Sequence, residues 1–133
     1  MQYLTLIHID PDLLAELPDA EYDRLMRGCF EKADALKKDG CLHGSQQLED
    51  PATARTLRVR EGVSRLTDGP FAETREFLAG FNLIEADSMD QAMAIAQQFP
   101  WASFGSIEVR PVRNMQAVRE HVGAKQAADG NRE

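Results

Sequence analysis

Three carboxylates and a hydroxyl group fall within nine consecutive residues near the middle of this 133-residue chain, at residues 68–76, which read Asp-Gly-Pro-Phe-Ala-Glu-Thr-Arg-Glu. Glu73 and Glu76 are three residues apart, which places both carboxylates on one side of a helical turn. Two neighbouring carboxylates can separate their pKa values and act as acid and base. We take Asp68 and Glu73 as candidate catalytic residues and Thr74 as a candidate ligand contact. Structural alternatives stay open, because such residues also build turns, bond local backbone or remain solvated.

The centre of the same stretch, at Gly69 and Pro70, favours a turn. Gly69 and Pro70 fix the turn, because glycine relieves the restriction that proline places on its predecessor. Phe71 can then enter the core as an anchor. Together with Tyr3, it is also a candidate for the apolar wall of a ligand cavity.

Two histidines and an arginine are further candidates for ligand contact. His8 and His43 fall in predicted strands that could be neighbours in one sheet, and an imidazole at a cavity wall can transfer protons. His8 alternates with isoleucines, so a packed and hydrogen-bonded core histidine is the alternative. Arg110 shares a strand face with Glu108, which gives either an ion pair across the strand or a clamp for a ligand carboxylate.

Other kinds of site lack their sequence signatures. No close spacing of His or Cys offers three metal ligands, and there is no phosphate-binding glycine loop, dinucleotide fingerprint or nucleophile elbow. We therefore expect neither a metal nor a cofactor. Cys29 and Cys41 favour buried thiols in a reducing compartment, with a redox pair as the alternative.

The charge of the chain bears on its partners. A net charge of −7 and a pI near 4.9 argue against nucleic acid as a partner. Four arginines at positions 55, 58, 60 and 65 are explained by a solvated hairpin face. Residues 1–7 contain no basic segment typical of a leader, and nowhere do eighteen apolar residues run together. We expect a soluble, cytoplasmic protein without membrane contact.

Hydrophobic periodicity predicts the elements that must position these residues. Strands are expected at 3–9, 41–48, 79–85 and 105–112, and a hairpin is expected from 56–60 and 63–67. A long helix follows Pro18 and closes at Gly40, and a second helix begins at a capping box of Ser88 and Gln91 and ends at Pro100.

Without the hairpin, the order is βαββαβ, the ferredoxin-like split βαβ arrangement. This α+β class has an antiparallel sheet with helices on one face. The uncovered sheet face predicts a homodimer, in which two sheets meet. We expect one domain at 1–113, then a short helix and a mobile polar tail at 114–133.

Several stretches of the chain resemble YCII-related proteins that carry a DGPF domain, and the similarity spans most of residues 1–113. They are the nine residues at 68–76, Leu48, Pro51, Thr53-Ala54, Thr56-Leu57-Arg58-Val59-Arg60, Gly80-Phe81, Leu83-Ile84 and Ser106-Ile107-Glu108-Val109-Arg110-Pro111-Val112. The chain departs from the family pattern at Asn82, where an aromatic residue is commoner, and at His43-Gly44-Ser45, where a glycine pair is more usual.

The resemblance implies a subunit of a dimeric α/β barrel, with a cavity between sheet and helices where the signature loop lies. Such dimers include isomerases and monooxygenases that use no metal. We therefore expect a small organic ligand in a cavity bordered by the loop, with metal-free acid and base chemistry if the protein is an enzyme. The alternative is a non-enzymatic regulatory or interaction module, which the resemblance links to alternative sigma factor systems.

Overall fold

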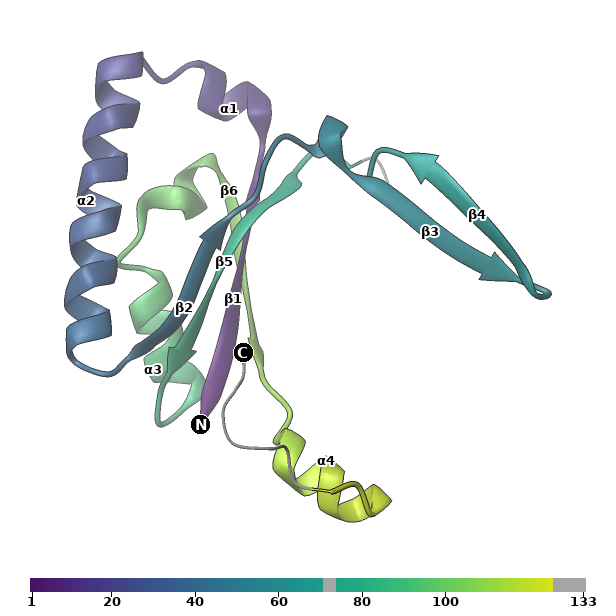
Figure 1. Cartoon of the computed structure of the whole chain (residues 1–133). Helices are drawn as coiled ribbons and strands as arrows, with labels where there is room; N and C mark the ends of the chain where they lie inside the picture. The colour runs from purple at the N-terminus through teal and green to yellow at the C-terminus, as the bar shows by residue number, and fades with distance from the viewer. Residues whose placement is uncertain (71–73, 126–133) are drawn as a thin grey trace.

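The computed structural model describes residues 1–70 and 74–125 as an α+β fold with a projecting hairpin (Figure 1). The main sheet contains β1 (Gln2–Ile9), β2 (Leu42–Gln47), β5 (Phe77–Glu85) and β6 (Gly105–Pro111). Its order is β2-β5-β1-β6, and every neighbouring pair is antiparallel. With helices α2 (Asp19–Lys38) and α3 (Met89–Ala96), this gives the ferredoxin-like arrangement that the periodicity predicts.

One face of the sheet packs against the helices, and α2 and α3 lie on that side in Figure 1. Alternation along the strands sends Tyr3, Thr5 and Ile84 inward, and all three are buried. The core cluster consists of Tyr3, Leu36, Leu42, Ile84, Ala86, Ala92, Ile95 and Phe99. On the opposite face, Leu4 pairs with Leu83 and Leu6 with Phe81, and no described helix covers these half-buried side chains.

The helices begin and end for local reasons. The Ser88 side chain accepts the Gln91 N–H, as the capping box predicts, and Lys37 and Lys38 lie in the last turn of α2. A short helix, α1 (Pro11–Ala15), lies between β1 and α2, where the sequence predicts no helix. The reason is a local cap: buried Asp10 accepts the Asp12 N–H at 2.9 Å, and proline is favoured in the first helical turn.

The hairpin stands away from the rest of the molecule. Its strands, β3 (Arg55–Arg60) and β4 (Val63–Asp68), form a separate two-stranded sheet and follow a 3₁₀ turn, η1 (Pro51–Thr53). Glu61 and Gly62 make the connecting turn with positive φ angles, the combination that matches the twist of a tight hairpin. We call residues 55–68 the arm.

A second 3₁₀ turn, η2 (Pro100–Phe104), leads into β6. Helix α4 (Met115–Val122) lies within residues 114–133, where a short helix is expected. Most of the predicted mobile tail falls on residues 126–133, outside the described part of the chain. No described helix is long and apolar enough to cross a membrane.

Candidate functional site

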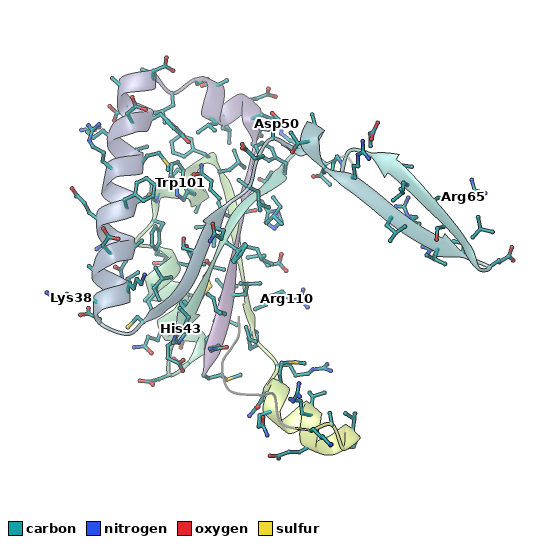
Figure 2. All side chains as sticks on the ribbon, in the orientation of Figure 1. Lys38, His43, Asp50, Arg65, Trp101 and Arg110 are labelled. Carbon is teal, nitrogen blue, oxygen red and sulfur yellow. The ribbon has the colours of Figure 1, made fainter. Side chains whose placement is uncertain are left out.

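A cavity of about 370 Å³ lies between α2 and the sheet. Its volume falls in the range typical of small-molecule sites. Aromatic rings form much of its wall: Tyr22 and Phe30 from α2, and Trp101 from η2. The Tyr22 and Trp101 rings are tilted against each other with centroids 6.1 Å apart. Figure 2 shows Trp101 between α2 and the sheet.

The cavity exists because α2 packs closely only toward its C-terminal end, where Leu36 is the helix's buried residue. Toward the N-terminus of α2, the facing part of the sheet contains small residues, among them Ser45 and Gly80. Gly80 is required by the neighbouring strand, since a Cβ there would lie 2.6 Å from the Gln46 carbonyl oxygen. Phe30 remains 63% exposed, although it belongs to the apolar stripe of α2 and lines the cavity.

One corner of the cavity is polar. Ser45 Oγ donates a hydrogen bond to Asn82 Oδ1 at 2.5 Å, and Asn82 is buried on the helix-facing side of β5. Within the described part of the chain, no hydrogen bond engages the Asn82 side-chain nitrogen, so its N–H groups are available to a ligand. Both residues stand where the sequence departs from the family pattern described above.

The lining contains no Asp, Glu, Lys, Arg or His among the described residues. Its ionisable groups are Tyr22 and Cys29. Burial raises the pKa of the Cys29 thiol, an effect that a hydrogen bond with Trp101 partly offsets. The thiol therefore stays protonated at neutral pH and is a weak nucleophile. A charged ligand would lose its hydration without gaining a counter-ion, which favours an uncharged one.

The two cysteines do not form a redox pair. Both are free thiols, and the Cys41 N–H donates to the carbonyl of Leu36, seven residues along the helix from Cys29. Seven residues correspond to about 10 Å of helix axis, which exceeds the separation that a disulfide can bridge.

Within residues 68–76, which we call the signature stretch, the described candidate residues lie apart from one another and from the cavity. Asp68 ends the arm with its side chain 90% exposed, beside Arg55 Nε at 3.5 Å. The Thr74 hydroxyl bonds the Glu76 carbonyl oxygen, which is the local alternative for that residue. Phe71 and Glu73 lie outside the described residues, and no described residue of 68–76 lines the cavity.

The remaining candidates lie elsewhere on the sheet. Tyr3 is in the core cluster and is not among the residues that line the cavity. His8 and His43 are not neighbours, contrary to the expectation, because β5 lies between their strands. His8 pairs with Leu78 near the start of β5, whereas His43 contacts Glu85 at its end, with Nε2 2.9 Å from Oε1. A hydrogen bond from the Met1 amino group, and then that from His43, lower the pKa of Glu85.

The uncovered sheet face carries a polar group where the signature stretch reaches the closing strand. Ser106 Oγ donates to Glu76 Oε1 at 2.6 Å, and His8 Nε2 lies 3.4 Å from Glu108 Oε1. Arg110 lies on this face and points away from the helices (Figure 2). The signature stretch and the closing strand, residues 106–112, which both resemble the family, are therefore in contact, on the face opposite the cavity.

Asn82 is a cavity residue that was not among the candidates from the sequence, although the strand pattern contains a signal for it. Gly80, Asn82 and Ile84 alternate along a predicted strand, and Ile84 marks the buried side. A buried amide needs a partner, so an asparagine at this position indicates either a local hydrogen bond or a ligand. Among the described residues, no group of three or more His, Cys, Asp or Glu could hold a metal ion.

The fold and sheet order define a ferredoxin-like α+β protein. The sequence matches the YCII-related domain over residues 1–116, and the chain belongs to that family. It is 36% identical over 114 residues to an uncharacterized protein of Rhizobium meliloti (strain 1021), an alignment that covers 84% of this chain and 92% of the relative. Neither the description of the domain nor the name of this relative states a reaction.

Proposed function

We propose that this protein binds a small, uncharged organic molecule in the cavity beneath α2. The observation that carries the proposal is the combination of an aromatic wall, formed by Tyr22, Phe30 and Trp101, with one polar corner at Ser45 and Asn82. Aromatic walls bind planar apolar groups, and a few placed polar groups orient them. The ligand we expect is a flat ring that bears a hydrogen-bond acceptor for the Asn82 N–H groups.

Acid and base catalysis receives less support from this cavity than binding does. A general base must lie within hydrogen-bond reach of the proton that it removes. No carboxylate or imidazole lines the cavity in the described part of the chain, and exposed Asp68 lies on the arm. We therefore propose a binding function without acid and base catalysis in this cavity.

A thermal-shift screen tests the proposal. Neutral aromatic amides and phenols should raise the melting temperature, because a ligand that binds only the folded state stabilises it by mass action, by about 2.7 kcal/mol at a hundredfold excess over Kd. Ser45→Ala and Asn82→Leu should remove the shift, whereas Ser106→Ala, on the opposite sheet face, should preserve it. Equal shifts in all four proteins would show that binding lies elsewhere.

We also propose a homodimer formed through the uncovered sheet face. Its support is the row of half-buried apolar side chains, Leu4, Leu6, Phe81 and Leu83, which the described part of this chain leaves without a cover. An antiparallel sheet can face water on one side, but an apolar row favours a partner. Light scattering should give twice the monomer mass of 14.8 kDa, and the monomer mass itself would refute the dimer.

A further inference from the structure

The arm has the form of an interaction element. It extends from the sheet on the side opposite α2, and its two strands pair only with each other among the described residues (Figure 1). The Gly69 N–H donates to the Ala54 carbonyl oxygen at 2.7 Å and closes its base. An isolated two-stranded hairpin is marginally stable in water. The arm therefore stands to gain from a surface that covers it.

The two faces of the arm differ in character. Leu57 pairs with Leu66, and Val59 lies two residues farther along the same face. Leu57 is 62% exposed and Leu66 is 68% exposed. The opposite face carries the pair of Arg58 with Arg65. One face is thus mainly apolar, apart from the Arg55 and Asp68 pair at its base, and the other is mainly basic.

The charge of the chain is divided between two segments. The arm holds four arginines and two acids, a net charge of +2, within a chain of net charge −7. Residues 1–23 hold six acids and neither Lys nor Arg, a net charge of −6. Asp10 is buried and paired with Arg75, so the other five acids form the acidic surface around α1 and the start of α2. Leu13 of α1 is 42% exposed. We call residues 10–23 the acidic corner.

We infer that the arm docks against the acidic corner of a second copy of this chain. The basic face of the arm complements an acidic surface that every copy carries. Its exposed leucines lie on the other face of the hairpin and would be covered where the arm crosses the rest of that copy. A two-fold axis makes the contact reciprocal, so each arm reaches the other copy's corner. The arm also projects on the side of the uncovered sheet face, so it extends toward a copy that covers that face (Figure 1). This inference goes beyond ligand binding and adds a second contact to the proposed homodimer.

The test uses the full chain and measures the dimer dissociation constant by light scattering over a concentration series. Leu57→Asp with Leu66→Asp should raise that constant roughly tenfold or more, since desolvated apolar contacts dominate interface energies. Both side chains are exposed, so circular dichroism should show an intact fold. The matched control is Val122→Asp, an exposed apolar position on α4 that should leave the constant unchanged.

Reversing the charges on the arm and then on the acidic corner tests whether the corner is the surface that the arm contacts. Arg60→Glu with Arg65→Glu should weaken the dimer, and adding Asp12→Lys with Glu16→Lys should restore it, since the pairing is then reversed. A wild-type monomer would overturn both this inference and the sheet-face dimer. A dimer that is indifferent to the arm substitutions, or one that the reversed corner fails to restore, would overturn this inference alone.

Discussion

Arg75 donates its Nε–H to Asp10 Oδ2 at 2.7 Å and thereby joins the end of the signature stretch to the cap of α1. Asp10 is buried, whereas most of the Arg75 side chain is exposed. The same carboxylate accepts the Asp12 N–H at the start of α1. A single carboxylate thus fixes two segments that are far apart in the sequence.

Loss of the Arg75–Asp10 contact should change how the melting temperature depends on pH. The Arg75 hydrogen bond holds the pKa of Asp10 below its ordinary value, against a smaller opposing effect of burial. A lowered folded-state pKa contributes stability above the unfolded pKa of about 4, and that stability is lost as pH falls toward the folded-state pKa. Arg75→Gln should lower the melting temperature at pH 7 by a few degrees, and its difference from wild type should shrink below about pH 4.

The control for this experiment is Arg27→Gln, which removes an exposed arginine of α2. It should leave the melting temperature nearly constant at both pH values, since isolated exposed charges contribute little. A constant difference between Arg75→Gln and wild type from pH 7 to pH 3 would contradict the role assigned to the Asp10 contact.

The β2–β5 pair beneath the cavity has no room for a methyl group at Gly80. A Cβ at Gly80 would lie 2.6 Å from the Gln46 carbonyl oxygen, whereas nothing lies within 4 Å of one at Gly44. Gly80→Ala should therefore cost about 1–3 kcal/mol of unfolding free energy in urea, and Gly44→Ala should cost much less. Equal costs would mean that β2 and β5 are not so closely spaced.

Cys29 should react slowly with thiol reagents near neutral pH. Burial raises its thiol pKa, and the thiolate is the reactive form. In a Cys41→Ser background, alkylation by iodoacetamide should be slow at pH 7 and accelerate at more alkaline pH. A rate at pH 7 equal to that of a small free thiol would show that the Cys29 site is open to solvent.

The sequence predicts the ferredoxin-like order because most of the main elements have a clear local signal, whereas β2 has a weak one. Alternation in residues 3–9 and the capping box at Ser88 and Gln91 require no knowledge of distant contacts. The position of α1 is an exception. Its five residues lack an apolar stripe, and the helix depends on the Asp10 cap, which the distant Arg75 holds in place.

The cavity could not be predicted in the same way. Tyr22, Met26 and Cys29 follow the spacing of any buried helix face, and only the separation of α2 from the sheet turns that face into a cavity wall. The carboxylates of residues 68–76 draw attention because charge is visible in a sequence. Asp68 nevertheless lies on the arm, and Glu76 binds Ser106 on the opposite sheet face.

The most direct measurement of ligand binding uses Trp101, the only tryptophan in the chain and a residue of the cavity wall. Its emission should change saturably on titration with benzamide and respond far less to benzoate, a carboxylate of similar shape for which the described lining offers no counter-ion. Asn82→Leu should remove the response to benzamide. Tighter binding of benzoate, or an unchanged benzamide titration in Asn82→Leu, would contradict an uncharged ligand held at the Ser45 and Asn82 corner.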